Sequence, residues 1–126
     1  MSATRSAFII FLNTRELTRF WSIAQTMIIY VDIDNTICET PETGEYHKAK
    51  PIYEHICKIN AMYDSGHTII YWTARGTRTG KDWRSLTEQQ LAKWLVKYHE
   101  LHLGKPVYDL FIDDKNINSE TFFNEY

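Results

Sequence analysis

Apolar residues in this chain form short continuous runs that alternate with longer stretches of helical periodicity. The first run covers residues 28–31 and leads directly into Asp32. Two more runs cover residues 68–72 and 107–112. All three are rich in Ile, Val and aromatic residues, which is typical of strands buried on both faces of a parallel sheet. We therefore expect three parallel strands at these positions.

Between the first two runs, apolar residues recur at the spacing of an amphipathic helix. Pro51 suits the first turn of a helix and Gly66 suits its stop. The apolar face of this predicted helix comprises Ile52, Ile56, Ile59, Met62 and Tyr63.

A second helix is predicted after the second run. Ser85 and Glu88 have the spacing of a capping box at its start. Its buried stripe comprises Leu91, Trp94, Leu95, Tyr98 and Leu101. Ser119 is predicted to cap a last short helix that contains Phe122 and Phe123.

This order of strands and helices predicts an α/β fold. Strand, helix, strand, helix, strand is typical of a three-layer α/β/α, Rossmann-like parallel sheet with right-handed connections. At 126 residues the chain is long enough for one domain, which we place at residues 27–126.

Residues 1–26 are interpreted as an N-terminal extension of uncertain structure. Its apolar run at residues 8–12 is too short to span a bilayer. The alternatives are a dispensable segment ahead of a translation start at Met27, a helix packed on the domain or on a second subunit, and a membrane-surface anchor.

Composition and charge restrict the class of partner. The net charge of −2 gives no electrostatic footprint for nucleic acid. Cys38 and Cys57 have neither metal-type spacing nor a secretory context, so free thiols and a cytoplasmic location are expected.

Polar residues follow each predicted strand. Asp32 ends the first strand and Asp34 lies two residues on, Thr73 follows the second, and Asp113 and Asp114 follow the third. The carboxyl ends of parallel strands lie at one edge of a sheet, where such sheets hold ligands. Because Mg²⁺ prefers oxygen ligands, this edge is a candidate magnesium site. The alternative is a set of ordinary solvated carboxylates.

These residues resemble the motifs of the haloacid dehalogenase superfamily. The run Asp32-Ile33-Asp34-Asn35-Thr36 is similar to its first motif, D-x-D-x-T. Thr73 resembles the second motif, Lys105 the lysine of the third, and Asp113-Asp114 the fourth, so the resemblance covers residues 27–123. Residues 72–75 and 111–115 look especially like small members without a cap domain that occur among bacterial polysaccharide-biosynthesis proteins.

The resemblance implies a Mg²⁺-dependent phosphatase that works through an aspartyl-phosphate. Asp32 would be the nucleophile and Asp34 the general acid and base. Asp113 would bind the metal directly and Asp114 through water or by orienting neighbours, with Asp32 and Asp34 completing the ion's protein ligands.

The remaining motif residues would hold the phosphoryl group. Thr73 would bind its oxygens, and Lys105 would place a positive charge against them, although Lys81 competes for that role. Asn35, Thr36, Ala74 and Arg75 are further candidates for binding phosphate or substrate. The family most often has Gly where this chain has Asn35, a residue that tolerates left-handed backbone.

No cap domain is expected, because the interval 37–50 has room only for a small flap. The site should then be open, and homo-oligomerisation is a hypothesis that rests on this openness. The basic loop with Arg75, Arg78, Lys81 and Arg84 would either grip a second phosphate, a carboxylate or a nucleotide, or be solvated.

The favoured substrate is a small phosphorylated metabolite such as a sugar phosphate. One alternative is a nucleic-acid 3′-phosphatase, because the phosphatase domain of polynucleotide kinases has a similar layout without a cap. An alternative of another class is a non-catalytic binding protein with the same fold, which would be expected to lose Asp32 or Asp34.

Overall fold

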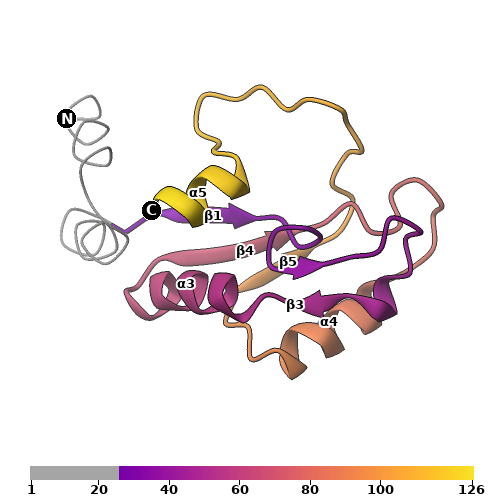
Figure 1. The fold of residues 1–126 in the computed structure, drawn as a ribbon, viewed down its shortest axis with the longest axis horizontal. Coiled ribbons are helices and arrows are strands. Elements are labelled where there is room, and N and C mark those ends of the chain that lie inside the picture. The colour runs from indigo at the N-terminus through magenta and orange to yellow at the C-terminus, as the bar shows by residue number, and fades with distance from the viewer. Residues whose placement is uncertain (1–25) are drawn as a thin grey trace.

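The computed structural model describes residues 26–126, and a three-stranded parallel sheet is its framework. The strands are β1 (Ile28–Val31), β4 (Thr68–Trp72) and β5 (Glu100–His102), in the order β1-β4-β5 (Figure 1). Val31 pairs with Tyr71, which in turn pairs with Leu101. The predicted α/β fold and its first two parallel strands are confirmed.

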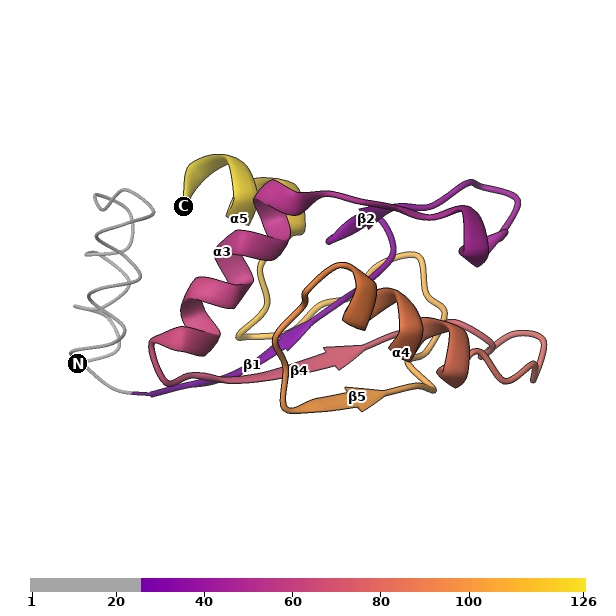
Figure 2. The same ribbon diagram turned by 90° about the horizontal axis from the view of Figure 1, so that it is seen from below.

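Three helices accompany this sheet: α3 (Tyr53–Asp64), α4 (Arg84–Lys93) and α5 (Ser119–Glu125). Figure 2 shows α3 and α4 on the same side of the strands. In the part of the chain that the structure describes, the sheet thus carries helices on one face rather than in the expected three layers. Among these residues, no helix is long and apolar enough to cross a membrane.

The helix ends differ in detail from the predicted ones. Ser85 lies inside α4, where Asp82 Oδ1 instead accepts a hydrogen bond from the Arg84 backbone N–H at 3.0 Å. Asn118, not Ser119, caps α5 by accepting from the Glu120 N–H at 2.9 Å. In both cases a polar side chain close to the predicted one accepts the hydrogen bond from a free backbone N–H group at the start of the helix.

A small flap connects β1 to α3. Its strands β2 (Cys38–Glu39) and β3 (Lys50–Pro51) pair antiparallel and enclose the short 3₁₀ helix η1 (Tyr46–Lys48). Pro51 therefore ends a strand instead of starting a helix. The expectation that this interval holds only a flap is confirmed.

The third strand lies where the sequence predicts a helix. Helix α4 ends at Lys93 and Leu95 adopts a φ of 60°, so the chain turns back and places Leu101 against β4. The predicted strand 107–112 and the predicted helical Leu101 are therefore wrong. Residues 107–112 are irregular, and their apolar side chains are exposed.

The core lies between the sheet and helices α3 and α4. Its fully buried side chains include Ile33 and Ile37 after β1, Tyr71 in β4 and Leu91 in α4. Helix α5 packs on α3, where the rings of His55 and Phe123 stack 3.8 Å apart. The predicted extension lies outside the described residues, apart from its last residue.

The position of the third strand can be tested by paired truncations. Leu101 is buried whereas Ile112 is 87% exposed. We expect Leu101→Ala to lower the free energy of unfolding by about 2–5 kcal/mol because it leaves a cavity. Ile112→Ala should change it by no more than about 0.5 kcal/mol. Chemical denaturation of both variants checks this, and a larger loss for Ile112→Ala would place the third strand at 107–112.

Candidate functional site

Asp32 follows β1 and lies at the edge where the strands end. Its Oδ2 atom accepts a hydrogen bond from Thr36 Oγ1 at 3.3 Å. The turn between them is closed by the Thr36 and Ile37 N–H groups, which both donate to the Ile33 carbonyl. Asn35 has a φ of 58° in this turn, so it adopts the left-handed conformation that Asn tolerates better than most residues.

Lys105 is the lysine that contacts this aspartate. Its Nζ lies 3.3 Å from Asp32 Oδ1, and only 13% of its side chain is exposed. Lys81 Nζ instead lies over the ring of Trp83, 4.3 Å from its centroid. Of these two lysines, Lys105 is therefore the one that lies beside Asp32.

The environment of Asp32 has opposing effects on its charge. Burial raises the pKa of its carboxyl group above the usual value, and the positive charge of Lys105 acts in the opposite direction. Lys105 thus favours the carboxylate form of Asp32.

Asp34 is held by a buried guanidinium. Arg75 donates from Nη2 to Asp34 Oδ1 at 2.8 Å and from Nε to Oδ2 at 3.0 Å. The Arg75 side chain has no exposed surface, while that of Asp34 is 21% exposed. Thr40 Oγ1 also donates to Asp34 Oδ1, so the carboxylate is fixed from two sides.

Helix α4 and the flap satisfy the rest of this arginine. Its Nη1 donates to Thr87 Oγ1 at 3.1 Å and to Gln90 Oε1 at 2.6 Å. The Tyr46 ring lies over the guanidinium, 4.8 Å away, and Gln90 Nε2 donates to the Tyr46 carbonyl at 2.7 Å. Arg75 is thus a positioning residue for Asp34 more than a group presented to substrate.

Thr73 lies beneath the site. It is fully buried, and its Oγ1 accepts a hydrogen bond from the Arg75 N–H at 3.1 Å. Its backbone carbonyl accepts from the Lys105 N–H at 3.1 Å. Thr73 therefore orients the backbone of both charged residues, and it is Ala74 that lines the cleft above it.

These residues surround an open cleft of about 450 Å³. Asp32, Asp34 and Lys105 line it. The chain after β5 contributes residues 106–108, and the flap contributes Thr40, Pro41, Glu42, Gly44 and Tyr46. Cys38 is buried near Asp34, and its burial raises the pKa of the thiol to about 11, so it is a poor nucleophile.

Asp113 and Asp114 are not brought to this cleft. Both are exposed on the segment between β5 and α5, which arcs away from the sheet in Figure 1. Asp114 pairs with its neighbour Lys115 at 3.2 Å. Within residues 26–126 no three His, Cys, Asp or Glu side chains gather closely enough to hold a metal. The expected cluster of four carboxylates is not formed in the described residues. The predicted strand 107–112, which would bring Asp113 and Asp114 to the cleft, is irregular there.

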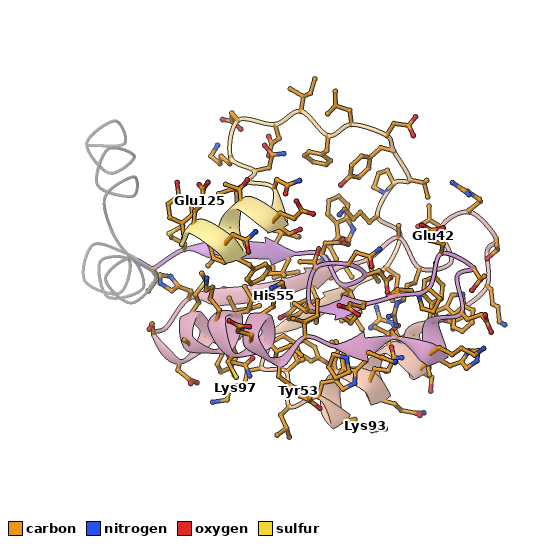
Figure 3. The ribbon with its side chains drawn as sticks, viewed as in Figure 1. Glu42, Tyr53, His55, Lys93, Lys97 and Glu125 are labelled. Carbon is orange, nitrogen blue, oxygen red and sulfur yellow. The ribbon has the colours of Figure 1, made fainter. Side chains whose placement is uncertain are left out.

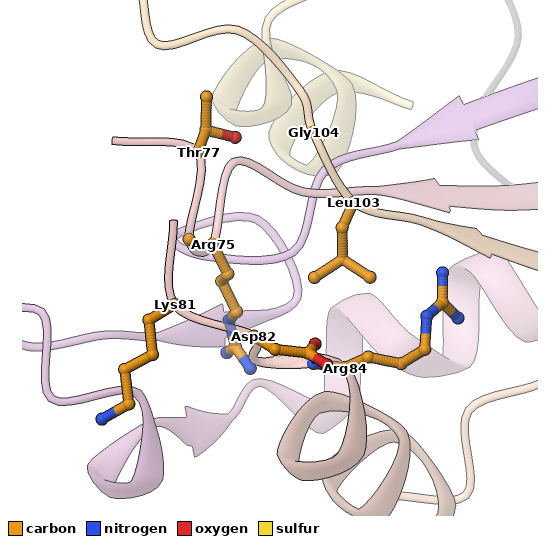
Figure 4. Close-up of a pocket in the computed structure, with 8 residues that line it drawn as sticks. Arg75, Thr77, Lys81, Asp82, Arg84, Leu103 and Gly104 are labelled. Atoms are coloured by element: carbon orange, nitrogen blue, oxygen red, sulfur yellow. The ribbon is translucent and has the colours of Figure 1, made fainter. Parts of the chain in front are cut away.

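The basic loop borders a second, smaller cleft of about 320 Å³. Figure 4 shows Lys81 and Arg84 extending away from each other. Arg84 donates to the Leu101 carbonyl at 3.0 Å and pairs with Glu88 at 3.6 Å. These cations therefore do not converge on one anion.

Sequence reasoning did not identify Thr87, Gln90 or Tyr46 as parts of the site. Thr87 and Gln90 are three residues apart on α4, beside the apolar stripe that includes Leu91. Buried polar residues at that spacing are a signal that the helix faces a polar group.

Comparisons with known proteins support the fold alone. No family model and no curated protein matches the chain. A crystal structure of a structural-genomics target from Vibrio cholerae is similar, with 25% sequence identity and a TM-score of 0.69. The match covers 81% of this chain and 90% of that chain. The similarity supports an α/β fold for most of the sequence.

The positioning role of Arg75 can be tested by removing its charge. Breaking a buried pair by removing one partner costs several kcal/mol, and the partial exposure of Asp34 reduces that cost. We expect Arg75→Met to lower the free energy of unfolding by about 2–4 kcal/mol. The exposed Arg78→Met in the same loop is the control and should change it by less than about 0.5 kcal/mol. Equal effects in denaturation would remove Arg75 from this role.

Proposed function

We propose that this protein is a Mg²⁺-dependent phosphomonoester hydrolase that works through an aspartyl-phosphate. The observation that carries the proposal is the pair of Asp32 and Lys105 at the carboxyl end of β1, with a second fixed carboxylate two residues on. A nucleophile, a positive charge beside it and an acid–base group are the parts that phosphoryl transfer needs.

Asp32 is the proposed nucleophile. One of its carboxylate oxygens forms a bond to phosphorus while the bond from phosphorus to the ester oxygen breaks. Lys105 lies where it would neutralise the charge shared by the carboxylate and the phosphoryl oxygens. Water then attacks phosphorus, which releases phosphate and restores the Asp32 carboxylate.

Asp34 is the proposed general acid and base. It would give a proton to the leaving alkoxide and later take one from the attacking water. Arg75 and Thr40 leave its side chain little freedom, so its position relative to Asp32 is set before substrate binds.

The oxygen atoms of the aspartates after β1 are of the chemical type that binds magnesium. Mg²⁺ is commonly held by one or two carboxylates, with waters and substrate phosphate completing its shell. Asp32 lines the cleft, so its carboxylate would be the principal ligand. The Asp34 carboxylate is largely occupied by Arg75, and the resemblance assigns the ion to the backbone carbonyl of Asp34 instead. When bound, the ion supplies charge neutralisation between two anions.

Asp113 and Asp114 remain proposed ligands from the motif resemblance. To reach the ion, the segment that carries them would have to approach the cleft. Leu110 and Ile112, on the same segment, are 75% and 87% exposed. Burying such large apolar side chains is favourable, which gives this segment a reason to dock.

The substrate is proposed to be a small phosphorylated metabolite. A nucleic-acid 3′-phosphatase receives less support, because Arg84 and Lys81 of the basic loop already have partners. A non-catalytic binding role is also less well supported, since both first-motif aspartates are retained. A cytoplasmic role in polysaccharide biosynthesis and a homo-oligomer with an open cleft are parts of the proposal that rest on the resemblance.

Hydrolysis of p-nitrophenyl phosphate with and without Mg²⁺ tests the proposal. We expect Mg²⁺-dependent turnover that Asp32→Asn abolishes, because the amide is a very poor nucleophile. Asp109→Asn, an exposed aspartate after Lys105, should retain the wild-type rate. Full activity of Asp32→Asn would overturn the assignment of the nucleophile.

The same assay decides the role of Asp113. If Asp113 binds the ion, Asp113→Asn should raise the Mg²⁺ concentration needed for half-maximal rate by about 10–100-fold. An unchanged Mg²⁺ requirement would exclude Asp113 from the site.

A titration of the Mg²⁺-free protein tests the pairing of Asp32 with Lys105. Because burial raises the pKa of Asp32, its carboxyl group should titrate above the range of an ordinary aspartate in an NMR titration. The positive charge of Lys105 lowers that pKa, so Lys105→Met should raise it further. Lys81→Met is the control and should leave the pKa of Asp32 in place. A carboxyl titration that does not respond to Lys105→Met would contradict the pairing.

A further inference from the structure

We propose that the cleft selects phosphate monoesters of neutral, hydroxyl-bearing leaving groups, namely sugars and polyols, and that Glu42 and Tyr108 make this selection. The inference rests on the proposed phosphatase function and adds a substrate class to it. It follows from the charges and the aromatic surface of the part of the cleft that lies beyond Asp32 and Lys105.

The charged side chains that line the cleft form ion pairs with one another, except for the carboxylate of Glu42. Asp32 pairs with Lys105, and Asp34 pairs with Arg75. Glu42 also lines the cleft, and in the described part of the chain it has no salt bridge. Figure 3 labels Glu42 on the flap, between β2 and β3. A second anionic group on the substrate would meet this carboxylate without a counter-charge.

Two cations of the basic loop do not change this balance. Lys81 and Arg84 line the smaller cleft instead, with Lys81 over Trp83 and Arg84 bound to the Leu101 carbonyl. The Thr77 hydroxyl donates to the Lys105 carbonyl at 2.8 Å, which joins the basic loop to the chain between the two clefts. Glu42 is therefore the charged side chain of the main-cleft lining that has no ion-pair partner among the described residues.

Tyr108 supplies a surface for the body of the substrate. Its ring is 45% exposed, lines the main cleft and lies 5.4 Å from Lys105 Nζ. A leaving group bound to a phosphate at Lys105 would therefore lie beside this ring. An aromatic face suits the C–H face of a sugar, while a carboxylate accepts hydrogen bonds from its hydroxyl groups.

The combination also disfavours other leaving groups. Rejecting a competitor through an unpaired like charge is a common way to gain specificity. Bisphosphates and sugar acids carry a second anion and should be rejected by Glu42, whereas simple apolar esters would leave its carboxylate without hydroxyl partners. Nucleoside di- and triphosphates should be poor substrates for the same reason as bisphosphates.

Matched substrates separate this inference from the proposed function. The pair is fructose 6-phosphate and fructose 1,6-bisphosphate, with p-nitrophenyl phosphate as a generic ester, all assayed with Mg²⁺. We expect the monophosphate to be preferred in kcat/KM, and Glu42→Gln to shrink the preference about three- to fivefold, as for one partly exposed like-charge contact. Glu39→Gln, an exposed carboxylate of β2 outside the cleft lining, should leave it unchanged.

The aromatic contact is tested in the same way. Tyr108→Leu should raise the KM for fructose 6-phosphate severalfold more than the KM for acetyl phosphate, which has no ring to contact Tyr108. If wild-type protein hydrolyses p-nitrophenyl phosphate but Glu42→Gln leaves the preference unchanged, or the bisphosphate is preferred, the inference fails and the phosphatase proposal stands. If none of these esters is hydrolysed with Mg²⁺, the phosphatase proposal itself fails.

Discussion

The buried ion pair of Arg75 and Asp34 is the interaction on which the rest of the site depends. A guanidinium with no exposed surface is unfavourable unless its donors are satisfied. Asp34, Thr87 and Gln90 accept those hydrogen bonds, and they come from the turn after β1 and from α4. One side chain thereby joins the end of β4 to the turn after β1 and to a helix.

The pair also determines the geometry around Asp32. Because Asp34 is fixed from two sides, the turn that carries both aspartates has little freedom. Thr73 extends this control, since its hydroxyl and carbonyl hold the backbones of Arg75 and Lys105. The proposed nucleophile, its neighbouring cation and its acid–base partner are thus positioned by groups below the cleft.

The sequence predicts the parts of this arrangement that depend on local pattern. The apolar strands before Asp32 and Thr73, the helix with Ile56 and Ile59, and the left-handed tolerance of Asn35 are confirmed. The third strand was not predictable from pattern. Glu100–His102 is short and polar, and it forms a strand because Leu101 reaches the edge of β4. The partners of Arg75 were missed for a similar reason, since a buried arginine selects its acceptors through tertiary packing.

The central claim is that Asp32 attacks phosphorus. Its most direct test is to quench the protein with acid during turnover of a phosphate monoester in Mg²⁺ and to map phosphorylated peptides by mass spectrometry. The account predicts one phosphoryl group on Asp32, present during turnover and absent once substrate is exhausted. A phosphoryl group on another residue would contradict the account. When the phosphoryl-enzyme forms faster than it breaks down, it must accumulate, so finding no phosphoryl group while phosphate is being released would also contradict it.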